Sequence, residues 1–209
     1  VQMLNVMNSN IQKKTLNCSI CNFIAREFEQ ALMNGGIKYR IYGGIKFYQR
    51  TEIKSALAYL RLIQNENDND AFRRIINFPA RSIGKATLEK IETGAKQNQC
   101  SLFSYIQTDP SLSKQKKIYD FIQLIKHFQE RIRDEDVKME LYEQALYVFE
   151  HSGLMESYKK KQEVERLQHL SELCNAMKQF AQLYQTNDLT QYLSIVALVR
   201  SDICLFGFC

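Results

Sequence analysis

The chain has 209 residues, which is enough to bury a hydrophobic core and form one domain, or one domain with an appendage. Hydrophobic residues make up 45%, charged residues 24%, and the net charge is +5, an ordinary balance for a soluble globular protein. With only two prolines and eight glycines, the sequence favours long helices over an all-β sandwich. It has no apolar run long enough for a membrane span, and residues 1–14 lack the apolar core of a secretory signal, so a cytoplasmic location is expected.

The first half of the chain predicts helices with one extended segment between them. A helix is expected over residues 22–33, with Asn22 as its cap, and the alternating segment 38–42 is expected to be a short strand. Thr51 is a candidate cap for a helix that continues to Gln64, with apolar residues at helical spacing. A short helix then ends before Pro79.

The second half is helical nearly to its end. A helix begins after Gly84, and Ser101 is the candidate cap of a short helix that follows it. The longest apolar stripe lies within residues 118–132, and Asp188 is expected to cap a last helix that reaches about residue 199. The fold class is therefore mainly α, an irregular helical domain with at most one short strand pair.

Catalytic and metal-binding patterns are missing from the sequence. No glycine-rich loop ends in Gly-Lys-Ser/Thr to hold a nucleotide, and no Ser/His/Asp or Cys/His signature is present. Cys18 and Cys21 have the spacing of half a zinc site, but no second pair follows, so reduced thiols are the better interpretation of the six cysteines. We expect this chain to hold no metal and no cofactor.

The segment between Arg73 and Ile91 carries the most suggestive chemistry, a helix-hairpin-helix-like turn. The amides of Gly84 and Lys85 lie at a predicted helix N-terminus, where free N–H groups favour an anion, and Arg81 adds charge beside them. Residues 37–90 contain eleven Lys and Arg against five Asp and Glu, whereas the remainder of the chain nets −1. The segment could bind phosphates without reading sequence, although an Ile-Gly pair at a helix start also serves as an ordinary turn.

Two blocks of sequence closely resemble UvrD/Rep/PcrA-type superfamily 1 DNA helicases. GIKYRIYGGIKFYQRTEIKSALAYLRLI at 36–63 resembles the family pattern YRIYGG-x-x-F-x-x-R-x-EIK-D-A-x-AYLRL, with Ser55 where the family usually has Asp. NDNDAFRRIINFPARSIG at 67–84 resembles a second block that ends in Arg-Gly-Ile-Gly, and here Ser82 replaces the first glycine. Looser similarity continues through residues 152–161 and 188–199, so the resemblance covers about residues 22–199.

The resemblance implies a division of the chain into three parts. Residues 1–64 would derive from the edge of the second motor domain, 2A, with an aberrant N-terminus; residues 65–199 would form the helical 2B subdomain; the tail 200–209 is unassigned. In the parent family the motor uses ATP and Mg²⁺, and 2B contacts duplex DNA through the Arg-Gly-Ile-Gly turn and regulates unwinding. The matching positions here are Arg81, Ile83, Gly84 and Lys85, with Arg74 and Ser101 as weaker candidates. If the replaced glycine adopts a positive φ, Ser82 would strain the turn.

The leading interpretation is a truncated helicase fragment without a motor, which contacts duplex or forked DNA weakly and nonspecifically. Two alternatives stay open at this point. The chain could work within an ATP-dependent 3'-5' DNA helicase whose motor belongs to a longer product or to a partner chain. It could also be a helical interaction module that does not bind DNA, and an orphaned subdomain of this kind risks self-association through surface that the motor domains would cover.

Overall fold

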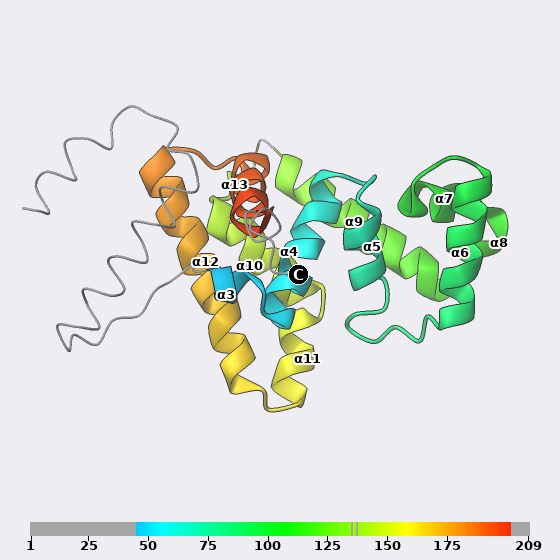
Figure 1. The fold of residues 1–209 in the computed structure, drawn as a ribbon, viewed down its shortest axis with the longest axis horizontal. Coiled ribbons are helices and arrows are strands. Elements are labelled where there is room, and N and C mark those ends of the chain that lie inside the picture. The colour runs from blue at the N-terminus through cyan, green and yellow to red at the C-terminus, as the bar shows by residue number, and fades with distance from the viewer. Residues whose placement is uncertain (1–44, 135, 137, 202–209) are drawn as a thin grey trace, which may run out of the picture. The chain divides into compact units, whose positions relative to one another are not determined.

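The computed structural model describes residues 45–134, 136 and 138–201. Residues 42–196 form one compact unit, and within the described residues all regular structure is helical (Figure 1). The helices are α3 (Ile45–Tyr48), α4 (Thr51–Gln64), α5 (Asn69–Ile75), α6 (Lys85–Gln97), α7 (Leu102–Thr108), α8 (Pro110–Ser113), α9 (Lys116–Arg133), α10 (Leu141–His151), α11 (Leu154–Lys160), α12 (Val164–Tyr184) and α13 (Leu189–Ser201). The mainly α prediction is confirmed, whereas the predicted helix 22–33 and strand 38–42 lie outside the described residues.

Helix α4 is the central element of this unit. It packs against α5, α9, α10 and α12, so it is buried on nearly every side, and Tyr59 and Leu62 are fully buried beyond the predicted apolar stripe. The predicted cap is wrong by one position: Thr51 is the first helical residue, and Arg50 before it provides no side-chain cap. The predicted helix end at Gln64 is confirmed.

The boundary predicted between residues 64 and 65 does not separate two compact units. Helix α4 precedes this boundary. The helices that pack against it, α5, α9, α10 and α12, all follow the boundary. The apolar surface of α4 is covered by those later helices, so α4 packs as part of one core with them. The derivation of residues 1–64 from a motor-domain edge stays a prediction.

A cluster of aromatic rings joins α5, α7 and α9. Phe72, Phe103 and Phe121 are each fully buried, with edge-on ring centroids 6.0 to 6.4 Å apart. Edge-to-face pairs at this spacing add to the stabilisation from apolar burial. Ser101 caps α7 by accepting a hydrogen bond from Ser104 N at 3.1 Å, which confirms the predicted cap. The cluster fixes α7 and α9 beside the turn that precedes α6.

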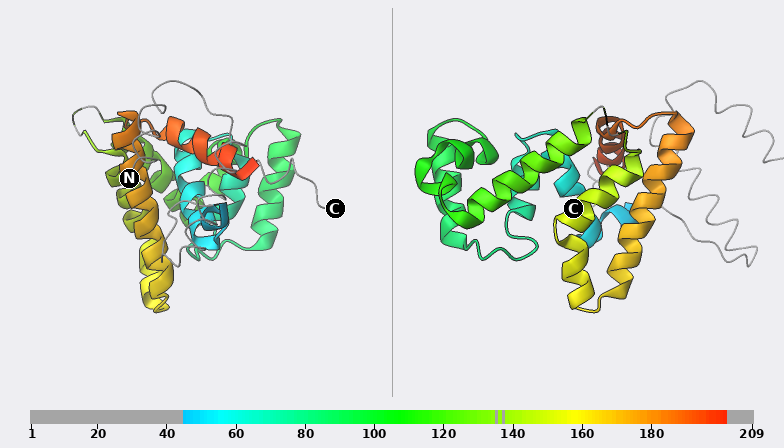
Figure 2. Two further views of the ribbon diagram at one scale, coloured as in Figure 1. Left: turned by 60° about the vertical axis from the view of Figure 1, so that its left-hand side comes forward. Right: turned by 180° about the vertical axis from the view of Figure 1, so that it is seen from behind.

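Helices α11 and α12 form an antiparallel hairpin (Figure 2), which also packs on α10. From α12, His169 reaches Glu52 on α4: His169 Nδ1 lies 2.6 Å from Glu52 Oε1, and both side chains are almost fully buried. The Arg50 guanidinium contacts both ring nitrogens of His169.

Two of the six cysteines lie among the described residues. Cys100 and Cys174 are free thiols, and burial raises the pKa of the Cys174 thiol to about 12. Cys18 and Cys21 lie outside the described residues. Among the helices that the structure describes, none is long and apolar enough to cross a bilayer.

Candidate nucleic-acid interface

The turn between α5 and α6 is held in shape by Asn77. Its side-chain Oδ1 accepts hydrogen bonds from Arg81 N at 2.8 Å and from Ile83 N at 3.2 Å, so two backbone donors are fixed from inside the turn. Between them, Ser82 has φ +57°, the left-handed conformation that favours glycine. The serine thus adopts the conformation expected of the glycine it replaces, at a cost of about 1 kcal/mol.

Arg81 points into the protein, in contrast to the expected role of adding charge beside the turn. Its guanidinium donates to the carbonyl oxygens of Ile75 at 2.9 Å, Pro79 at 3.2 Å and Ser152 at 3.2 Å, and to Tyr59 Oη at 2.7 Å. Burial raises the pKa of Tyr59, and the charge of Arg81 partly offsets that rise. The guanidinium also lies over the Phe121 ring, 5.4 Å from its centroid. Arg81 therefore anchors the turn to the core.

Ile83 has a similar anchoring role. Its side chain is only 5% exposed, so it fills the space beneath the turn, and the DNA contact expected at this position stays a prediction. An apolar side chain at this position fixes the backbone of the next two residues against the core. The sequence alone could not distinguish an anchoring role of Ile83 from a DNA-contact role, because both roles are compatible with an apolar residue at this position.

Gly84 and Lys85 form the exposed tip of the site. Gly84 is the N-cap of α6 and has no side chain, and open space surrounds the position where a Cβ would lie. No side chain caps the helix and its first turn contains no acidic residue, so the first amide groups of α6 face outward with their partial positive charge. The Lys85 side chain is exposed, and no carboxylate pairs with it in the described part of the chain.

Lys117, from the first turn of α9, reaches the same turn. Its Nζ donates to the carbonyl oxygen of Ser82 at 3.2 Å. A lysine at a helix N-terminus is disfavoured by the helix dipole, so its charge is not placed there to stabilise α9. Lys85 and Lys117 together put two positive charges beside the exposed backbone at Gly84.

The two weaker candidates are Arg74 and Ser101. Arg74 is exposed on α5 and forms no hydrogen bond or ion pair with the described residues. Ser101 is buried as the cap of α7, so its hydroxyl is already committed. The structure brings Arg81, Ile83, Gly84 and Lys85 together at one turn. Asn77 and Lys117 also contribute to this turn. Only Asn77 had a signal in the sequence, because it lies two residues before Pro79 in the second family-like block.

Comparisons with known proteins identify the family that the chain resembles. The family described as UvrD-like helicase C-terminal domain matches residues 3–206, beyond both ends of the range that the motifs cover. The chain is similar to DNA helicase II of Haemophilus influenzae, with 37% identity over 81% of the chain, and of Escherichia coli K12, with 35% over 80%. It is also similar to the ATP-dependent DNA helicase PcrA of Bacillus subtilis, with 34% identity over 85%.

These relatives are much longer proteins. The chain spans about a quarter of the length of each, 24% in all three cases. The family match covers nearly the whole chain, and the UvrD/Rep/PcrA resemblance inferred from the motifs is confirmed. The chain belongs to the UvrD-like helicase C-terminal domain family.

Proposed function

We propose that the unit 42–196 is a DNA-contacting regulatory region of the 2B type, which binds the phosphate backbone of duplex or forked DNA weakly and without sequence preference. The observation that carries this proposal is the exposed N-terminus of α6, where Gly84 leaves the amides uncovered and Lys85 has no carboxylate partner among the described residues. Backbone amides at a helix start and lysine ammonium groups bind phosphate but cannot distinguish bases.

In this proposal ATP hydrolysis, with its Mg²⁺, belongs to a motor outside the residues of this chain. The relatives include a protein named an ATP-dependent DNA helicase, and the chain spans only 24% of it. The region would act on unwinding by holding the duplex ahead of such a motor. The cytoplasmic location, contacts with motor domains and self-association remain predictions; the exposed side chains of Val164, Leu183 and Tyr184 on α12 are the apolar surface on which the latter two would depend.

The binding proposal is tested by fluorescence anisotropy with labelled forked, duplex and single-stranded DNA. We expect micromolar affinity for forked and duplex DNA at low salt, with the same affinity for unrelated sequences. Two phosphate contacts predict an affinity that falls about tenfold between roughly 50 and 200 mM salt. Absence of binding at micromolar chain concentration in low salt would remove the proposal, and an affinity that is insensitive to salt would contradict its electrostatic basis.

A further inference from the structure

Exposed lysines are concentrated in two segments, 82–90 and 111–120. Together these segments contain five lysines and two carboxylates, so they carry three of the five net positive charges of the chain. The lysines come from α6, the end of α8 and the start of α9, which belong to the end of the unit 42–196 where Figure 1 shows α6, α7 and α8 close together. All five are exposed, and they form the lysine surface: Lys85, Lys90, Lys114, Lys116 and Lys117.

Two hydrogen bonds place the two segments side by side. At one end, Lys117 Nζ donates to the carbonyl oxygen of Ser82 at 3.2 Å. At the other end, Lys90 Nζ donates to Ser111 Oγ at 2.9 Å. The first segment therefore runs forward along α6 while the second runs in the opposite direction beside it. The remaining two lysines of the second segment lie on the stretch of chain between these two contacts.

The charges of the lysine surface are not neutralised by the described part of the chain. None of the five lysines forms an ion pair with a described carboxylate, and the two carboxylates of these segments, Glu89 and Asp120, are themselves exposed. Lys116 and Lys117 lie in the first turn of α9, which contains no acidic residue, and the helix dipole disfavours a positive charge there. Their placement therefore does not stabilise α9, and it favours the binding of an external anion.

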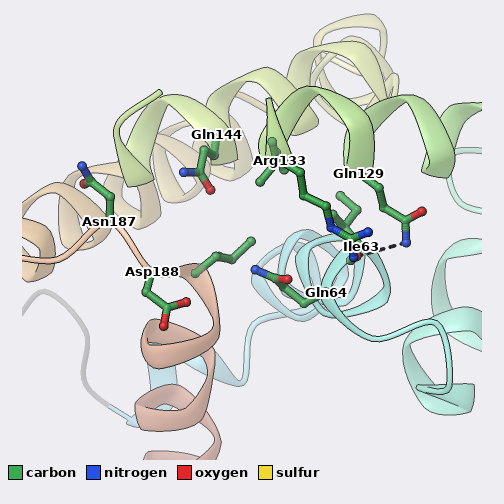
Figure 3. A pocket seen from close by; sticks show the side chains of 9 residues that line it. Ile63, Gln64, Gln129, Arg133, Gln144, Asn187 and Asp188 are labelled. Atoms are coloured by element: carbon green, nitrogen blue, oxygen red, sulfur yellow. Dashed lines mark hydrogen bonds between the residues drawn. The ribbon is translucent and has the colours of Figure 1, made fainter. Parts of the chain in front are cut away.

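The second segment is carried by a helix that is fixed in the core. Phe121 of α9 belongs to the buried aromatic cluster, and further along the helix Gln129 Nε2 donates to the carbonyl oxygen of Ile63 on α4 at 3.1 Å, the dashed line in Figure 3. The pocket drawn in that figure is lined by none of the five lysines. Because α9 is held at both places, its first turn has a fixed position beside the turn before α6.

We propose that the phosphate backbone of duplex DNA lies along the lysine surface, so that the contact at the turn continues to the corner between α8 and α9. This inference rests on the proposed function, whose site it enlarges. Lys85 and Lys90 are separated by a rise of about 8 Å along α6. One strand of B-DNA carries a charge about every 3.4 Å along its axis, so the surface spans about two to three phosphates of one strand. Lysine is a compact point charge, which contacts phosphates without reading the sequence.

The salt dependence of forked-DNA binding by the full chain distinguishes the lysine surface from the turn alone. Two contacts at the turn predict that the affinity falls about tenfold between roughly 50 and 200 mM salt, whereas five contacts predict a fall of about 500-fold. A fall near tenfold would overturn this inference and leave the proposed function in place. Absence of binding at low salt would remove both.

A charge-matched pair of double variants assigns the effect to this surface. Lys114→Gln with Lys116→Gln removes two of its charges, and the control, Lys159→Gln with Lys161→Gln, removes two exposed charges at the end of α11. Over the same salt range, the affinity of the first variant is expected to fall about 40-fold and that of the control about 500-fold, as in the wild type. Equal salt dependence in the two double variants would contradict the proposal.

Thermal unfolding of the same variants separates a lost DNA contact from a damaged fold. The variant with Lys114→Gln and Lys116→Gln should melt at the wild-type temperature or slightly above it, because a positive charge leaves the first turn of α9. Weaker DNA binding with unchanged or higher thermal stability supports a contact role. A lower melting temperature, with the wild-type salt dependence retained, would show that these lysines serve the fold and would overturn the proposal.

Discussion

Replacing Arg81 with methionine is expected to lower the free energy of unfolding by about 2–4 kcal/mol, as measured by urea denaturation. Methionine keeps part of the side-chain volume but donates no hydrogen bond. The carbonyl oxygens of Ile75, Pro79 and Ser152 would each lose a charged donor, and so would Tyr59 Oη. Arg81→Lys is expected to recover only part of the loss, since an ammonium group cannot reach four acceptors in one plane.

The matched control is Arg74→Met, on the helix just before the turn. Arg74 is exposed and has no hydrogen bond or ion pair with the described residues, so the change in unfolding free energy should stay within about 0.5 kcal/mol. Equal effects of the two substitutions would show that Arg81 does not anchor the turn and would return it to the role of a surface charge.

The buried contact between Glu52 and His169 gives the second large effect. His169→Leu would leave the Glu52 carboxylate buried beside an apolar side chain, and we expect a loss of about 3–5 kcal/mol of unfolding free energy. The histidine is 8% exposed and the glutamate 6%, so water does not readily replace the lost partner. Chemical denaturation at pH 7 measures the loss.

A double substitution separates the cost of the unpaired charge from the cost of changed packing. Glu52→Met together with His169→Leu removes both polar groups, and the double variant should be more stable than His169→Leu alone by about 1–4 kcal/mol. If the double variant is instead less stable than the single one, the contact is not a charge-dependent pair, and the effect of His169→Leu arises from packing.

The sequence predicted the helices well because local patterns determine them. Apolar residues at helical spacing predicted α4, and the hydroxyl of Ser101 and the carboxylate of Asp188 predicted two helix caps, all of which the structure contains. The family-like turn also predicted that Gly84 precedes a helix, and it raised the question of strain at Ser82, whose φ in the structure is positive. Such features depend on residues only a few positions apart.

Contacts between distant residues could not be predicted in this way. Arg81 was expected to face a phosphate, but the carbonyl oxygen that it contacts in Ser152 is 71 positions away, and no local pattern reveals that acceptor. The same limit applies to Glu52 and His169, which are 117 positions apart, and to Lys117 beside Ser82. The packing of α4 against helices much later in the chain is another long-range feature, and the predicted domain boundary after Gln64 stays a prediction.

The central claim, that the start of α6 contacts the DNA backbone, is tested most directly by comparing two lysines of that helix. Lys85 lies in its first turn and Lys96 in its last, about 16 Å apart along the axis, and both are exposed. Lys85→Gln and Lys96→Gln change the net charge equally. The slope of log affinity against log salt for forked DNA should decrease by about 1 in Lys85→Gln and stay unchanged in Lys96→Gln. Equal slopes in the two variants would contradict the claim.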